Sequence, residues 1–178
     1  MHQFAEDSPI ERRVGDALTD REETVAVAEG LTGGLVAALL TDRPGASAYL
    51  DRALVPYSYD SLRELLALDR ERLDAHGVVS EPVTGDIARA ARDTANATWG
   101  LATTGVAGPD GGSAETTVGT AFVGVAYAGP WGSESSTTTV ARYEFDGDRA
   151  AVRERAARQA LRDLLAQVDE REGADADE

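Results

Sequence analysis

The strongest constraint on the fold is a short strand-like run that meets an apolar helix through a glycine-rich turn. Residues 24–27 (Thr-Val-Ala-Val) are rich in β-branched side chains, which favours a buried strand. Residues 35–40 are apolar and, with their flanks, long enough for a helix. The turn between them, residues 28–34 (Ala-Glu-Gly-Leu-Thr-Gly-Gly), has a backbone that can approach a ligand closely. Many α/β proteins use such a turn for packing alone, so ligand binding stays open here.

The rest of the chain alternates helices and strands. Helices are expected at residues 9–20, from 34 to about 42, around 62–66, around 68–76, after Ser80 as N-cap, and after Asp148 as N-cap. Strands are expected at residues 24–28, 48–57, 98–103, 117–128 and 135–145, the last two as an antiparallel hairpin. This order predicts one domain over residues 1–178, an α/β/α sandwich with a mixed sheet. Its core spans about residues 10–168, after a frayed start at 1–8 and before a solvated acidic tail at 170–178.

The charge of the chain restricts its partners. There are 32 acidic residues against 17 basic ones, a formal net charge of −15, and every basic residue is arginine. Such self-repulsion argues against nucleic acid or an anionic membrane as a partner. An acidic chain without lysine is typical of a high-salt cytoplasm, where charges are screened over a few ångströms. An acidic protein from a GC-rich genome, which favours arginine over lysine, is the alternative.

Other classes are excluded by what the sequence lacks. It has no cysteine and only two histidines, His2 and His76, so neither a disulfide framework nor a metal site is expected, and no cofactor is predicted. No run approaches the roughly 18 apolar residues of a membrane span. The acidic Glu6 and Asp7 do not fit a signal peptide, so a cytoplasmic location is expected.

Several motifs together carry a family resemblance. They are residues 28–34 (Ala-Glu-Gly-Leu-Thr-Gly-Gly), 44–48 (Pro-Gly-Ala-Ser-Ala) leading to 55–58 (Val-Pro-Tyr-Ser), 76–81 (His-Gly-Val-Val-Ser-Glu), 104–112 (Thr-Gly-Val-Ala-Gly-Pro-Asp-Gly-Gly) and 145–149 (Phe-Asp-Gly-Asp-Arg). They resemble the C-terminal domain of the competence/damage-inducible CinA family, also known as the nicotinamide mononucleotide deamidase PncC family. The resemblance runs from about residue 10 to 168, and the glycine-rich loop at 104–112 is its most specific part.

The resemblance implies an amidohydrolase fold that converts nicotinamide mononucleotide into nicotinate mononucleotide and ammonia. It assigns the chemistry to a serine nucleophile in the first motif and a lysine base after the Tyr-Ser segment, since a desolvated neutral amine can take a hydroxyl proton. It also implies a standalone form of the domain, without the molybdopterin-binding-like domain to which it is often fused. Family members are commonly oligomeric, so a homodimer or a higher homo-oligomer is expected.

The site residues of the family match only in part. Ser47, Tyr57, Thr104 and Arg149 stand at corresponding positions and are expected to line one pocket for a small-molecule nucleotide. Backbone amides at Gly33, Gly34 and from Gly105 onward are expected to add an anion cradle. Each retained side chain also has a purely structural explanation.

The two reactive positions do not match. Gly30 occupies the nucleophile position and Leu62 the base position, so the hydroxyl and the amine are both missing. Arg63, next to Leu62, stays protonated and cannot serve as a base. The sequence therefore predicts a domain that keeps a nucleotide pocket but lacks Ser–Lys catalysis. A rewired amidohydrolase and a purely structural domain stay as alternatives.

A rewired site would need another nucleophile or base. The candidates are Thr32 or Ser47 as nucleophile, or a water molecule activated by Glu29. His76 is the one histidine near the motifs, and a place at a helix C-terminus before Gly77 is the favoured interpretation.

Overall fold

The computed structural model describes residues 9–175, and two kinds of element alternate along it. The helices are α1 (Ile10–Asp20), α2 (Leu35–Thr41), the 3-10 turn η1 (Ala46–Ala48), α3 (Tyr59–Leu66), α4 (Arg70–His76), α5 (Glu81–Ala95) and α6 (Arg149–Asp175). The strands are β1 (Val25–Glu29), β2 (Leu50–Leu54), β3 (Trp99–Gly105), β4 (Thr120–Tyr127) and β5 (Thr137–Glu144).

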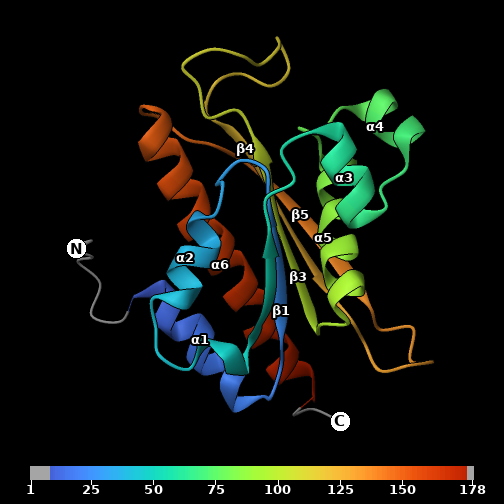
Figure 1. Cartoon of the computed structure of the whole chain (residues 1–178). Helices are drawn as coiled ribbons and strands as arrows, with labels where there is room; N and C mark the ends of the chain where they lie inside the picture. Colours follow the sequence, from blue (N-terminus) through green and yellow to red (C-terminus); the bar gives the residue numbers. More distant parts are fainter. Residues whose placement is uncertain (1–8, 176–178) are drawn as a thin grey trace.

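The strands form one mixed sheet in the order β2-β1-β3-β4-β5. β1 runs parallel to β2 and to β3, whereas β3–β4 and β4–β5 are antiparallel. Helices α1, α2 and α6 cover one face of the sheet, and α3, α4 and α5 cover the other (Figure 1). The predicted α/β/α sandwich with a mixed sheet is therefore confirmed.

Two large apolar clusters fill most of the space between the sheet and its helix layers, and a third, smaller one contains Leu31 and Val152. On the α1/α2/α6 side the core includes Val14, Leu18 and Leu161, packed under Trp99 of β3. On the opposite side Leu62 and Ile87 belong to a second cluster with small residues of the sheet. Large aliphatic side chains thus fill the first layer, while alanines line much of the second.

The small residues of the sheet let α5 approach it closely. A Cβ atom at Gly100 of β3 would lie 2.0 Å from the Ala88 carbonyl oxygen, and one at Gly124 of β4 would lie 2.9 Å from the Thr84 carbonyl oxygen. Only glycine leaves room for the helix backbone at these two points. This close packing brings Thr84 of α5 within reach of the end of β3.

Most predicted elements are confirmed to within a few residues, with two corrections. Ser80 precedes α5, but its hydroxyl donates to the Gly77 carbonyl oxygen and makes no capping bond. The expected tail after residue 170 is helical through Asp175, because α6 continues past Val168 without a break. The frayed start expected at residues 1–8 lies outside the described residues.

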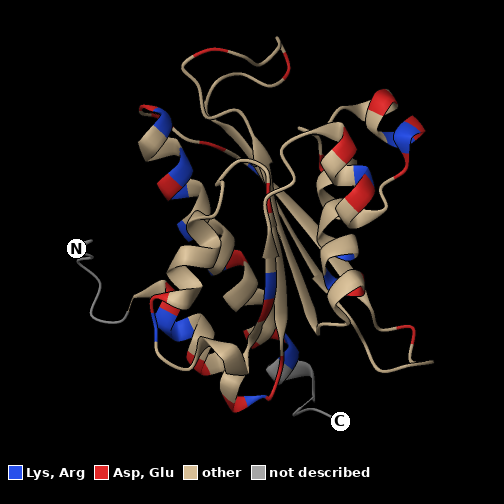
Figure 2. Ribbon diagram, viewed as in Figure 1, with Lys and Arg blue, Asp and Glu red and all other residues tan. Residues whose placement is uncertain are grey.

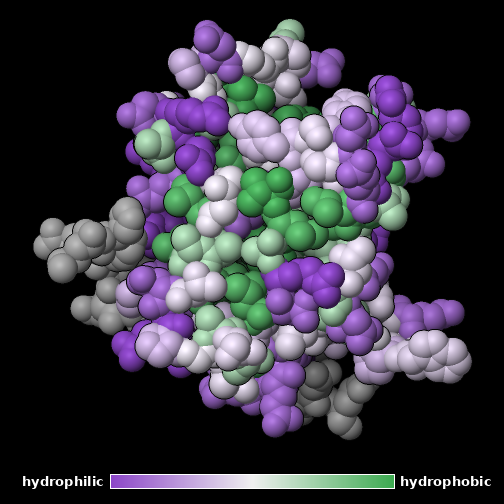
Figure 3. Space-filling view, in the orientation of Figure 1, coloured by the Kyte–Doolittle hydropathy of each residue, from purple (hydrophilic) through white to green (hydrophobic). Residues whose placement is uncertain are grey.

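Most charged residues lie on the helices and loops, and β3 and β4 carry none (Figure 2). Figure 3 shows an apolar area on the face where β2 forms the edge of the sheet, and Val55 and Leu65 are 46% and 47% exposed. On β2 itself Asp51 and Arg52 form an exposed ion pair, with 2.7 Å between Oδ1 and Nε. Such charges on an edge strand oppose unwanted pairing with another chain.

Candidate functional site

The turn between β1 and α2 is fixed to the neighbouring strand β3. The amides of Gly30 and Leu31 donate to the Thr103 carbonyl oxygen at 2.9 and 3.2 Å. Gly33 and Gly34 have φ values of +57° and +94°, which only glycine adopts without strain. Gly30 is outside that region, and a Cβ there would lie 3.2 Å from the Thr103 carbonyl oxygen. A serine at Gly30 is therefore tight but compatible with the backbone.

Glu29, which ends β1, is a fully buried carboxylate with four hydrogen-bond donors. Its Oε2 accepts from the Thr32 hydroxyl at 2.6 Å and from the amides of Gly34 and Val36 at 2.9 and 3.0 Å. Its Oε1 accepts from the Ala37 amide at 2.9 Å. The carboxylate thus satisfies the first amides of α2 from inside the protein.

This arrangement changes the expected anion cradle. The Gly34 amide already donates to Glu29, so the cradle predicted there is wrong for that amide. Gly33 lies against the Arg153 guanidinium, which donates from Nη2 to the Thr32 carbonyl oxygen at 2.7 Å. This side of the turn therefore packs against α6, away from the hollows described next.

Two adjoining hollows open where β1 and β3 end, and they share Gly30, Tyr57 and Gly105 in their linings. The larger, of about 240 Å³, is lined by Gly30, Pro56, Tyr57, Ser58, Tyr59, Leu62, Val78, Val79, Thr104 and Gly105. The smaller, of about 160 Å³, is lined by Gly30, Leu31, Tyr57, Gly105, Val106, Ala107, Gly108, Asp110 and Arg149. Together they form the candidate site.

Arg149, the first residue of α6, connects the smaller hollow to two loops. Its Nη1 donates to the Gly108 carbonyl oxygen at 2.9 Å, and its Nη2 donates to the Tyr57 hydroxyl at 3.1 Å. Tyr57 is 70% exposed, so its ring forms the outer wall between the hollows. Among the described residues that line either hollow, Arg149 supplies the one positive charge.

Thr104 lies at the floor of the larger hollow near the end of β3. Its side chain is buried, and its Oγ1 is 2.7 Å from Oγ1 of Thr84 on α5. The Thr84 hydroxyl also donates to the Ser80 carbonyl oxygen at 2.7 Å. A hydroxyl chain therefore connects the floor of the hollow to the start of α5.

The two positions that the resemblance assigns to nucleophile and base line the same hollow. Gly30 and Leu62 both border the 240 Å³ space, and Leu62 is 2% exposed. Since the chain contains no lysine, the hollow offers neither a hydroxyl at the first position nor an amine at the second. The two positions therefore share one hollow, and neither residue carries a group that could react.

The structure places most of the predicted site residues around the two adjoining hollows, but not Ser47. Tyr57, Thr104 and Gly105 line the hollows, as does Arg149, but their roles in ligand binding stay predictions. Ser47 is exposed in η1, just before β2, and the register pairs Val25 with Leu50 where both strands begin. It therefore lies at the opposite end of the sheet from Gly30, about 16 Å away along β1.

The groups that a rewired site would need are placed elsewhere. Thr32 and Glu29 are both fully buried and border neither hollow, so they are not accessible as nucleophile or base. His76 is exposed at the end of α4 with Gly77 as C-cap, which confirms the interpretation as a helix C-terminus. Arg63 is exposed and lies 3.8 Å from the Asp60 carboxylate.

Thr84 is the site residue that sequence reasoning missed. It stands in the interior of α5, where a threonine has no distinctive pattern, and it belongs to none of the family motifs quoted above. Its contact with Thr104 depends on α5 packing closely over Gly124, which the local sequence does not reveal.

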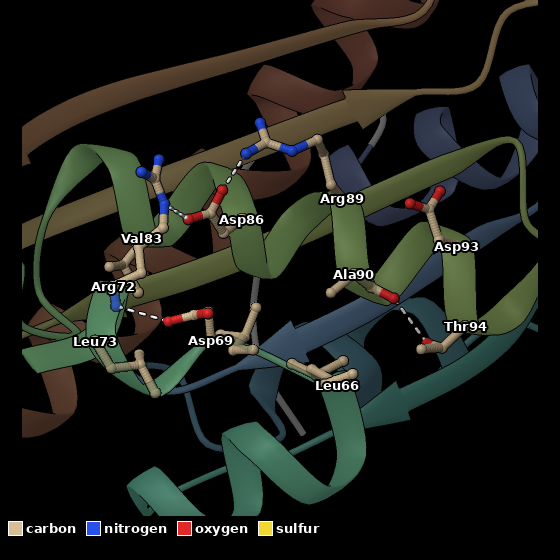
Figure 4. A pocket seen from close by; sticks show the side chains of 12 residues that line it. Leu66, Asp69, Arg72, Leu73, Val83, Asp86, Arg89, Ala90, Asp93 and Thr94 are labelled. Carbon is tan, nitrogen blue, oxygen red and sulfur yellow. Dashed lines mark hydrogen bonds and ion pairs between the residues drawn. The ribbon is translucent and has the colours of Figure 1, made fainter.

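A still larger hollow of about 430 Å³ lies between α3, α4 and α5 (Figure 4). Its charged groups already have partners, since Asp86 accepts from both Arg72 and Arg89, and Asp93 accepts from Arg92. Asp69 caps α4 by accepting from the Arg72 amide at 3.1 Å. Its floor is apolar, with Leu66 and other aliphatic side chains, so it offers few polar groups for ligand recognition.

Within residues 9–175, no group of three or more acidic or histidine side chains is placed to hold a metal ion. None of the helices in that range combines the length and apolar character of a membrane span.

The fold and the site define an α/β/α domain with a small polar cleft beside a strand–turn–helix motif. Residues 7–168 match the family model of the CinA C-terminal domain. The chain belongs to the CinA C-terminal domain family.

Named relatives agree with this assignment. The nicotinamide-nucleotide amidohydrolase PncC of Escherichia coli is 41% identical over 159 residues, which cover 89% of this chain and 92% of that protein. A CinA-like protein of Chlorobium limicola is 40% identical over 164 residues, covering 92% of this chain. The chain spans only 38% of that longer relative.

Solved structures show the same fold. A CinA superfamily protein from Klebsiella pneumoniae superposes with a TM-score of 0.83 at 30% identity, covering 90% of this chain and 96% of its own. The competence/damage-inducible protein CihA of Agrobacterium tumefaciens gives 0.83 at 34% identity, covering 93% and 98%.

Proposed function

We propose that this CinA-family domain binds a pyridine nucleotide in the paired hollows and does not hydrolyse it by the family's Ser–Lys chemistry. One observation carries the proposal: Gly30 and Leu62 border the same hollow, so both reactive groups of the family are missing from a site that keeps Tyr57 and Thr104 in its lining. The name of the Escherichia coli relative supplies the ligand class, a nicotinamide nucleotide.

The electrostatics suggest how the ligand lies. A nucleotide phosphate seeks positive charge, and Arg149 provides it in the smaller hollow. The pyridine carboxamide then occupies the larger hollow beside Gly30 and Thr104. No metal ion or organic cofactor enters this proposal.

Restoration of the missing groups tests the proposal most sharply. We expect wild-type protein in high salt to bind nicotinamide mononucleotide by calorimetry and to release no ammonia above background. The double variant Gly30→Ser/Leu62→Lys is expected to release ammonia, because both groups then face one hollow. Robust ammonia release by the wild type contradicts the loss of catalysis, and absence of binding contradicts the ligand.

Leu66 offers a matched control. It lies one turn after Leu62 on α3 and is equally buried at 2% exposure, but it borders the 430 Å³ hollow. Gly30→Ser/Leu66→Lys has the same composition as the restored variant and should stay inactive. Equal activity of the two double variants would show that the lysine does not act at the proposed position.

We also propose that the chain works in a high-salt cytoplasm and that it forms a homo-oligomer. The first rests on the charge of −15 without lysine, and the second rests on the family resemblance alone. Light scattering in high salt measures the oligomeric state, and a monomeric mass contradicts it.

A further inference from the structure

The direction of the hydroxyl chain under the larger hollow is fixed by its last acceptor. Each threonine hydroxyl has one proton. The Ser80 carbonyl oxygen can only accept, so the Thr84 proton points to it across 2.7 Å. Thr104 must then donate its own proton to Thr84 Oγ1, also at 2.7 Å. The proton of Thr104 is therefore directed into α5, and its oxygen keeps only lone pairs for other partners.

Thr103, whose side chain lies on the other face of β3, has its hydroxyl proton fixed in the same way. The Thr32 hydroxyl donates to the Glu29 carboxylate at 2.6 Å. Thr103 must therefore be the donor in its 2.8 Å bond to Thr32. The Thr104 proton is thus committed to α5, and the Thr103 proton is committed to the turn between β1 and α2.

We propose that Thr84 is a positioning residue that makes the floor of the larger hollow a hydrogen-bond acceptor, so that the site selects a carboxamide over a carboxylate. The inference rests on the proposed function. The N–H group of a carboxamide can donate to Thr104 Oγ1, whereas a carboxylate brings only lone pairs and meets an oxygen that has no proton to give. Accepting a carboxylate requires Thr104 to abandon Thr84, which leaves a buried acceptor unpaired.

The consequence is discrimination between two nucleotides that differ in one group. The net value of one neutral hydrogen bond corresponds to a preference of about five-fold for nicotinamide mononucleotide over nicotinate mononucleotide. The phosphate and the ribose are common to both, so the ratio of the two affinities isolates the floor of the hollow.

Calorimetric titration of both nucleotides against wild type and Thr84→Val, in high salt, tests the inference. Valine has nearly the same shape as threonine but cannot accept, so the Thr104 proton becomes free to turn toward a carboxylate. We expect the wild-type preference for the amide to fall to about two-fold or less. Thr84→Ser keeps the hydroxyl and should keep the preference. Thr84→Ala provides the same loss of acceptor if the valine variant does not fold.

The outcomes separate this inference from the proposed function. If Thr84→Val acts only on the structure, it lowers the affinity for both nucleotides equally and leaves the ratio of the two affinities at its wild-type value. That result overturns the inference but not the proposed function. A wild-type preference for the carboxylate also overturns it. Failure of both nucleotides to bind the wild type overturns the proposed function and the inference with it.

Discussion

At the scale of single residues, two positions shape the lining of the larger hollow and one shapes the turn beside it. Gly30 and Leu62 border that hollow and bring neither a hydroxyl nor an amine to it. Glu29, directly before Gly30, holds the turn together by accepting four hydrogen bonds in a fully buried position. The carboxylate that looks available as a base in the sequence is part of the scaffold.

Glu29→Gln tests this structural role. The amide nitrogen of glutamine must face at least one of the four donors, so a buried N–H or O–H loses its acceptor. We expect the free energy of unfolding to fall by about 3 kcal/mol. Glu23→Gln is the control, because the Trp99 Nε1 group, which donates to Glu23 at 2.7 Å, can still donate to an amide oxygen. Urea denaturation measures the free energy of unfolding of both variants. Equal losses of stability would contradict the structural role of Glu29.

Single residues also show which parts of the candidate site could be predicted from the sequence and which could not. The positions of Gly30, Leu62, Tyr57 and Thr104 could be predicted because local motifs carry them. Ser47 could not be placed with them by motif alone, although it precedes a strand while Tyr57 follows the same strand, which sends the two to opposite ends of the sheet. Residues that belong to one family motif can therefore lie far apart in the folded protein.

At the scale of elements, α6 is held to the edge of the sheet by a small polar cluster. The Tyr143 hydroxyl of β5 donates to both carboxylate oxygens of Asp163 at 2.9 Å, and the Gln159 amide donates at 2.8 Å. Burial raises the pKa of Asp163 above its ordinary value, while these hydrogen bonds oppose the shift. Burial likewise raises the pKa of Tyr143.

This cluster predicts a pH dependence. Because the folded pKa of Asp163 lies above the unfolded value of about 3.9, its stabilising contribution is present at lower pH and is lost as pH rises through the folded pKa. The stability of Asp163→Asn relative to wild type should therefore improve between pH 4 and pH 7. Urea titrations at these two pH values measure the difference, in which the other carboxylates cancel. A relative stability that falls over that interval contradicts the direction of the shift.

Element boundaries were largely predictable because hydrophobic period and turn residues are local signals. Asp148, for example, accepts from the Ala151 amide at 2.9 Å, as its place before the last helix indicated. Contacts between elements were not predictable in the same way. The Thr84–Thr104 bond exists only because α5 lies directly on the glycines of β3 and β4.

At the scale of the whole molecule, the charge of −15 is the dominant property. Most of the charged side chains in the described part of the chain are exposed or half-buried, and their mutual repulsion opposes the compact state. The Debye length falls from about 10 Å at 0.1 M salt to about 3 Å at 1 M. The urea midpoint should therefore rise steadily as KCl increases over that range. An unchanged or lower midpoint contradicts the proposal that the chain is adapted to high salt.

The central claim, binding without hydrolysis, is tested by one NMR experiment on wild-type protein mixed with excess nicotinamide mononucleotide in high salt. Saturation transferred from the protein to the pyridine protons reports binding, and growth of nicotinate mononucleotide resonances reports hydrolysis. We predict saturation transfer that Arg149→Ala weakens, with no product resonances during prolonged incubation. Product that forms in proportion to protein concentration, or no saturation transfer at all, would contradict the account.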